Sequence, residues 1–124
     1  MAKDFTSASE YLQEADKIMA QRATLRDTAE GERSMADAVN AFNILTGHKL
    51  SETDGWKFMK ILKMARAKNG QYNEDDYSDG VAYSALEAES ASKENAHSQA
   101  QFQKRKEEFP PLNDSFAFDS KLKD

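Results

Sequence analysis

The sequence predicts an all-α protein, a bundle of four main helices followed by a polar helix and an extended C-terminal arm. Three observations predict this class. Apolar residues recur at helical spacing in four segments, each segment opens with a capping residue, and no segment alternates strictly between apolar and polar residues as a half-buried strand does. The 124 residues suit a single hydrophobic core, and two prolines and five glycines are too few for a turn-rich all-β chain.

The starts of the four helices are predicted from capping boxes. In this motif a Ser, Thr or Asn side chain bonds the backbone of the third helical residue, whose acidic side chain returns the bond. Four pairs with this spacing occur in order along the chain: Ser7 with Glu10, Ser34 with Asp37, Ser51 with Asp54, and Asn73 with Asp76. Apolar residues at helical spacing follow each pair, so each pair is expected to open an amphipathic helix.

The ends of the helices and their connections complete the bundle. Gly47 is a predicted cap for the second helix, and Asn69-Gly70 ends the third. The short connections favour antiparallel neighbours. Residues 27–33 are different, because they form a polar connection without apolar periodicity, which indicates a role besides turning the chain.

The composition changes near residue 90. Residues 90–108 are polar and predict a weakly amphipathic helix, which Phe109-Pro110-Pro111 ends. The arm that follows is either a frayed terminus or a segment that docks on a neighbouring subunit or partner through Phe116, Phe118 and Leu122. We therefore expect an α-helical bundle domain at residues 1–90, with the polar helix and arm at residues 91–124.

Composition excludes several classes of protein. Without cysteine there is no disulfide scaffold, no cysteine-ligated zinc and no thiol catalysis. No apolar run approaches the roughly 20 residues that span a bilayer, and the N-terminus lacks a secretory pattern, so a soluble cytoplasmic protein is expected. A net charge of -5 argues against general nucleic-acid binding. A chain of this size struggles to cover the apolar faces of such helices, so a homo-oligomer is expected.

Charge is segregated between the third and fourth helices. Residues 54–68 carry five positive side chains and one negative, whereas residues 69–90 carry six negative side chains and no positive one. One interpretation is compensation between neighbouring helices, in which each exposed pair contributes less than ~1 kcal/mol. The other is a cleft with a basic and an acidic wall, which suits a phosphorylated small molecule, with or without Mg²⁺.

Candidate ligand-binding residues lie on the polar connection and the third helix. Arg33 precedes the exposed N–H groups of the second helix and could complete an anion site with Arg26 and Glu32, or it could form a loop salt bridge. The lysines on the third helix are either a solvated face or phosphate contacts: Lys57, Lys60 and Lys63.

Two further sets of residues on the predicted third and fourth helices have alternative interpretations. Three aromatic residues could stack on a base, or they could belong to the core, where aromatic residues at helical spacing usually lie: Trp56, Tyr77 and Tyr83. Asp76 and Asp79 could bind a metal or a ligand, or they could stabilise the positive end of the helix as capping carboxylates. Neither His48 nor His97 has a partner at metal-ligand spacing.

Residues 30–43 read Glu-Gly-Glu-Arg-Ser-Met-Ala-Asp-Ala-Val-Asn-Ala-Phe-Asn, and this run resembles the signature of a family of small tailed-bacteriophage proteins of uncharacterised function. The resemblance covers roughly residues 11–89. Other motifs of the family occur in the same order: Arg26, Thr46-Gly47, Gly55-Trp56, Phe58-Met59, Lys63 to Arg66, and Asp79 to Leu86. It implies a phage-encoded protein of the host cytoplasm.

That family is distantly similar to the all-α, MazG-like nucleotide pyrophosphohydrolases, which hold magnesium with Glu-Glu-x-x-Glu on one helix and Glu-x-x-Asp on the next. Asp76-x-x-Asp79 matches the position of the second motif. The first motif is not matched, because lysines occupy the polar face of residues 56–63. Two carboxylates alone do not complete a multi-ligand magnesium cluster, so the sequence favours binding over turnover.

Three functions follow as expectations. The leading one is a phage protein that binds a nucleotide or other phosphorylated small molecule, for example to sequester a nucleotide signal of host defence. The second is a magnesium-dependent nucleotide pyrophosphohydrolase that uses Asp76 and Asp79. The third is an inhibitor that docks on a host protein through the C-terminal arm.

Overall fold

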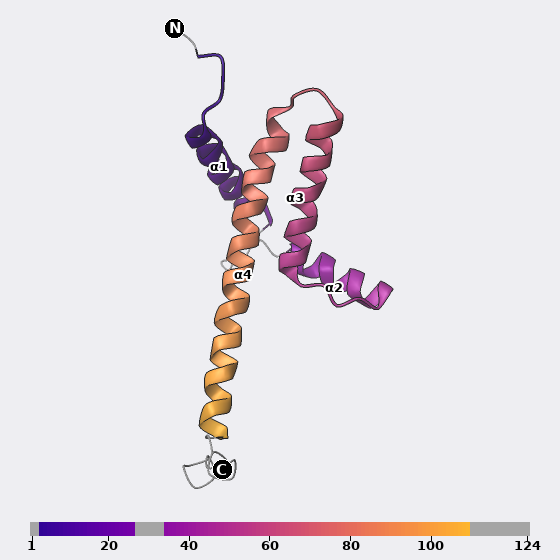
Figure 1. The fold of residues 1–124 in the computed structure, drawn as a ribbon, viewed down its shortest axis with the longest axis vertical. Helices are drawn as coiled ribbons and strands as arrows, with labels where there is room; N and C mark the ends of the chain where they lie inside the picture. The colour runs from indigo at the N-terminus through magenta and orange to yellow at the C-terminus, as the bar shows by residue number, and fades with distance from the viewer. Residues whose placement is uncertain (1–2, 27–33, 110–124) are drawn as a thin grey trace, which may run out of the picture. The chain divides into compact units, whose positions relative to one another are not determined.

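The computed structural model describes residues 3–26 and 34–109, with the side chains of the first segment described up to Arg22. These residues form four helices: α1 (Ala8–Arg26), α2 (Ser34–Thr46), α3 (Glu52–Asn69) and α4 (Glu74–Glu108) (Figure 1). None of the described residues lies in a strand. The all-α class with four helices is therefore confirmed. Glu32, Arg33 and the arm beyond Phe109 lie outside the described residues.

Capping boxes open α1 and α3 as the sequence predicts. The Ser7 amide donates to a Glu10 carboxylate oxygen at 3.0 Å, and the Glu10 amide donates to the Ser7 hydroxyl at 3.1 Å. At α3 the Ser51 amide donates to Asp54 at 2.9 Å, and the Asp54 amide donates to the Ser51 hydroxyl at 3.1 Å. Each box satisfies backbone N–H groups that a helix start would otherwise leave unbonded.

The fourth helix differs from the expectation in its length. The sequence predicts a separate polar helix after residue 89, whereas the structure has one continuous helix of 35 residues. No glycine or proline occurs between Gly80 and Phe109, so nothing in this stretch breaks the backbone hydrogen bonding. The chain divides into two compact units, Met1–Ala91 and Ser92–Asp124, and α4 contributes residues to both.

Within the first unit, α3 and α4 run antiparallel side by side (Figure 1). Near the start of α3, the hydroxyls of Thr53 and Ser90 share a buried hydrogen bond of 2.7 Å. One turn later the rings of Trp56 and Tyr83 stack with centroids 5.8 Å apart. The core is small, because the described residues bury only five apolar side chains: Ala15, Val39, Trp56, Ala82 and Tyr83.

The second helix packs against the beginning of α3 at a glycine. A Cβ on Gly55 would lie 2.8 Å from Cγ2 of Val39, so only glycine allows α2 to approach this closely. The connection after α2 is fixed by Asn43, whose side chain accepts from the Leu50 amide and donates to the Leu50 carbonyl, each at 2.9 Å. Gly47 supplies the positive φ of 75° that ends α2, as predicted. The corner between α2 and α3 is therefore well defined.

No helix in the described part of the chain is both long enough and apolar enough to cross a membrane.

Candidate functional site

A cleft between α3 and α4 brings together four of the residues that the sequence singles out. It has a volume of about 260 Å³. Its lining contains Lys60, Lys63, Met64, Ala67, Asp76, Tyr77, Gly80, Val81 and Ser84. Most of the surface that lines the cleft is apolar, and a few polar groups converge on it, which is the usual composition of a small-molecule site.

The lysines of the cleft are paired with carboxylates of α4. Lys63 Nζ lies 2.7 Å from Oδ2 of Asp79, and Lys60 Nζ lies 2.9 Å from Oε1 of Glu87. Arg22 of α1 reaches the other oxygen of Asp79 at 3.8 Å, so two cations share one carboxylate. The charge compensation that the sequence suggests is present at these residues. Lys60 and Lys63 nevertheless both line the cleft.

Asp76 differs sharply from Asp79, although each is only 9% exposed. The carboxylate of Asp76 has no hydrogen-bond or ion-pair partner among the described residues. The sequence predicts that the Asn73 side chain bonds the amide of Asp76. In the structure the Asn73 side chain accepts from the amide of Asp75 instead, at 3.0 Å. A buried carboxylate without a partner is costly, so Asp76 offers an unused acceptor to anything that enters the cleft.

The donor set does not fit a magnesium site. Among the residues that the structure describes, no group of three or more His, Asp or Glu side chains is placed to hold a metal. The oxygens of Asp79 face Lys63 and Arg22, and two cations beside them would repel a divalent ion. Of the two candidate metal ligands on α4, only Asp76 remains, which with no further ligand in the described part of the chain is too few for a cluster of the pyrophosphohydrolase kind.

The remaining candidates are placed as follows. Tyr83 is buried against Trp56 and is not among the lining residues of the cleft. Lys57 is exposed and also lies outside the lining. Arg26 is at the end of α1, in the part whose side chains are not described, and Glu32 and Arg33 follow it outside the described residues.

The aromatic residue of the cleft is Tyr77, one of the three aromatic residues for which the sequence suggests base stacking. Its ring is half-exposed and stacks on Tyr72 with centroids 5.6 Å apart. A helical pattern could have distinguished it from Tyr83, because Tyr77, Gly80, Val81 and Ser84 are spaced i, i+3, i+4 and i+7 and so share one face of α4. Which aromatic faces the cleft depends on the rotation of α4, and the number of aromatics in the sequence does not reveal it.

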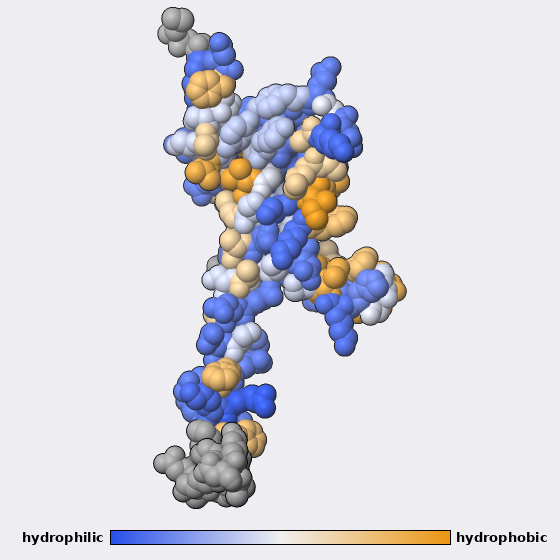
Figure 2. All heavy atoms as spheres, viewed as in Figure 1, coloured by the Kyte–Doolittle hydropathy of each residue, from blue (hydrophilic) through white to orange (hydrophobic). Residues whose placement is uncertain are grey.

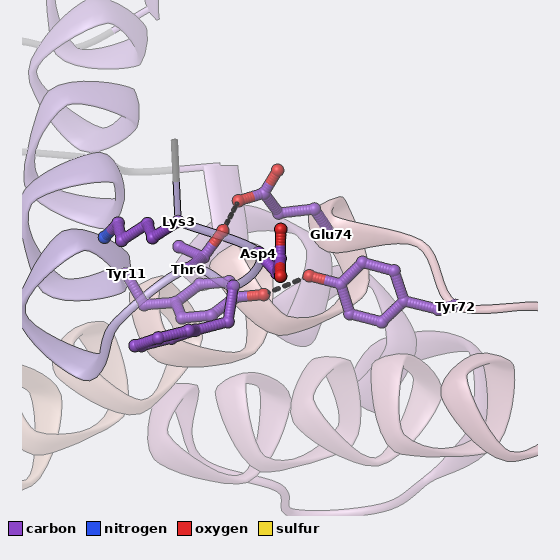
Figure 3. A pocket seen from close by; sticks show the side chains of 7 residues that line it. Lys3, Asp4, Thr6, Tyr11, Tyr72 and Glu74 are labelled. Atoms are coloured by element: carbon purple, nitrogen blue, oxygen red, sulfur yellow. Dashed lines mark hydrogen bonds between the residues drawn. The ribbon is translucent and has the colours of Figure 1, made fainter. Parts of the chain in front are cut away.

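A second hollow, of about 550 Å³, lies where the N-terminal segment meets the start of α4 (Figure 3). Four of its polar side chains are bonded in two pairs. Thr6 Oγ1 donates to Glu74 at 2.9 Å, and the hydroxyls of Tyr11 and Tyr72 share a hydrogen bond that raises the pKa of Tyr72 to about 12. We interpret this region as an attachment of the N-terminal part of the chain, because Thr6 and Tyr11 bond to Glu74 and Tyr72 across it.

Comparison with known proteins gives a family and no function. No curated protein and no solved structure matches the chain. The profile of a family described as Domain of unknown function (DUF6378) matches residues 10–91. This range contains α2, α3, the cleft and all of α1 except its first two residues. Because the match covers more than half of the chain, this protein belongs to the DUF6378 family.

Proposed function

We propose that this protein binds a phosphorylated small molecule, with a nucleotide as the leading candidate, in the cleft between α3 and α4. The observation that carries the proposal is the meeting of two lysines and an unpartnered buried Asp76 in one largely apolar hollow. Cations suit phosphate oxygens, apolar walls suit a ring, and a carboxylate suits ligand N–H or O–H groups.

Each lining group has a distinct role in this proposal. Lys60 is the more accessible lysine, so a phosphate can replace Glu87 as its partner. The ring of Tyr77 and the side chain of Met64 provide the surface for a base. Asp76 accepts a hydrogen bond from an exocyclic amine or a ribose hydroxyl.

The size of the cleft limits how much of the ligand it encloses. Its volume of about 260 Å³ is near the lower end of the roughly 300–1,000 Å³ typical of drug-sized ligands. A phosphate and one ring fill it, and the rest of a nucleotide stays in contact with water. We therefore expect modest affinity for a single nucleotide.

The direct test is calorimetric titration of the purified chain with nucleoside mono-, di- and triphosphates, the parent nucleosides and inorganic phosphate. We expect binding that requires the phosphate and that Asp76→Asn and Lys60→Gln weaken by about tenfold, or about 1.4 kcal/mol. Lys57→Gln is the matched control, since this lysine is on the same helix outside the lining. No binding of any compound, or equal losses in Lys57→Gln and Lys60→Gln, would contradict the proposal.

Turnover is a separate question with its own measurement. The proposal is binding without hydrolysis, because Asp79 is held by two cations. Pyrophosphate release that requires Mg²⁺ and disappears in Asp79→Asn would instead support the pyrophosphohydrolase alternative. In the setting that the phage resemblance implies, binding without turnover would serve to sequester a host nucleotide signal in the cytoplasm.

A further inference from the structure

The strongest unexplained feature of the first unit is apolar surface on α2 and the adjoining side of α3. Figure 2 shows hydrophobic side chains gathered over these two helices. Six large side chains are between 42% and 84% exposed, and we call them the apolar face: Phe42, Ile44, Leu45, Leu50, Phe58 and Ile61. Isolated exposed apolar residues are normal, but a group of six on two packed helices and the connection between them marks an interaction surface.

The composition of α2 shows how unusual this exposure is. Eight of its 13 residues are apolar, yet it buries only Val39. A helix that is apolar on most of its circumference normally lies inside a protein. The described part of the chain buries five apolar side chains and leaves six large ones on this face. Covering the face would more than double the apolar core.

We propose that the apolar face is the interface of a two-fold dimer, in which α2 of each copy packs on the outer side of α3 of the other. With roughly 200 Å² for each large side chain, the exposed fractions amount to roughly 750 Å², close to the roughly 800 Å² that each partner buries in a stable interface. The Gly55 contact and the Asn43 bonds hold the corner in shape before association.

A second copy fits this face better than a different protein does. Because the core is small, burying the apolar face would stabilise the folded chain at all times. A second copy of the chain is always present to bury it, whereas a different partner is not. Residues 38–47 contain no charged side chain, which is typical of the centre of a homodimer interface. Asp37 of α2 and Lys57 of α3 are exposed and opposite in charge, so packing α2 of one copy on α3 of the other can bring unlike charges together.

The first test is the mass of the purified full-length chain in solution, measured by light scattering. We expect twice the 13.9 kDa of one chain, and a melting temperature that rises with protein concentration. Phe58→Asp should give single chains, whereas Phe102→Asp should stay dimeric. These two residues are matched, since they are 66% and 62% exposed and only the first is on the apolar face.

A second test avoids a disruptive substitution. The chain has no cysteine, so Ile61→Cys and Leu12→Cys each carry one thiol, at positions 58% and 63% exposed. At high protein concentration we expect a maleimide to label Ile61→Cys at least about tenfold more slowly than Leu12→Cys. On about hundredfold dilution the two rates should converge. Equal rates at all concentrations, or a wild-type mass of one chain throughout, would overturn the proposal.

Discussion

The two sides of α3 differ in how well their side chains are matched by the rest of the described structure. On the side toward α4, Lys60 and Lys63 each meet a carboxylate. On the outer side, Phe58 and Ile61 meet little besides solvent. Buried charges are tolerated when they are paired, and exposed apolar groups are costly when they are grouped. The charged side chains of α3 therefore find their partners within one chain, whereas the apolar side chains on its outer side do not.

The largest expected effect is on the charged side, at the most buried ion pair. Lys63→Met leaves Asp79 with Arg22 alone, at 3.8 Å, and should lower the free energy of unfolding by about 3 kcal/mol. Lys60→Met should cost less than ~1 kcal/mol, because the Lys60 side chain is one-third exposed. Urea denaturation measures both.

The double variant Lys63→Met with Asp79→Leu is the control for this comparison. Replacing both partners by apolar groups removes the unpaired charge, so most of the loss should be recovered. A loss in the double variant as large as in Lys63→Met would mean that the lysine contributes through packing and not through its charge.

The second prediction concerns the corner that presents the apolar face. Gly55→Ala places a Cβ against Val39, and the resulting overpacking should lower stability by about 2 kcal/mol. Gly80→Ala on α4 is the control, because a Cβ there has no neighbour within 4 Å and alanine favours a helix by roughly 0.5–1 kcal/mol. The two substitutions should therefore shift the thermal midpoint in opposite directions. A stabilising Gly55→Ala would show that α2 can move away from α3 at little cost.

How far the sequence predicts this structure depends on whether a feature is local. The helix starts at Ser7 and Ser51 were predictable, because a capping box is set by residues three apart. The continuity of α4 is not evident from composition, because the change at residue 90 resembles a boundary although no helix-breaking residue occurs there.

The candidate site shows the limit of local patterns. The opposite charges of α3 and α4 were visible in the sequence, but the pairing of Lys63 with Asp79 depends on the register of the two helices. The same register sends Tyr83 to the core and leaves Tyr77 at the cleft. Spacing along one helix does not determine how that helix is rotated against its neighbour, so these assignments depend on the packing of the two helices.

The third prediction contrasts Asp76 and Asp79, which are equally buried and differ in their partners. Asp76→Asn removes a charge without breaking an ion pair among the described residues, so stability should stay unchanged or rise by up to about 1 kcal/mol. Asp79→Asn should be destabilising, because Lys63 loses its partner. Thermal unfolding of both variants without ligand is the measurement. A marked loss of stability in Asp76→Asn would indicate a structural bond to this carboxylate and weaken its role as a free acceptor.

The smallest expected effect is the pH dependence of the hydrogen bond between Tyr11 and Tyr72, which attaches the N-terminal part of the chain. The hydrogen bond with Tyr11 holds the Tyr72 phenol in its neutral form and raises its pKa from 10.0 to about 12. A pKa that is higher in the folded than in the unfolded chain adds stability at pH values below 10, and this contribution disappears as the pH rises toward 12. Absorbance of the tyrosinate should therefore show one tyrosine that titrates late, and Tyr11→Phe should return it toward 10. A late-titrating tyrosine that persists in Tyr11→Phe would show that the raised pKa does not come from the bond to Tyr11, and that the bond between Thr6 and Glu74 attaches this part of the chain instead.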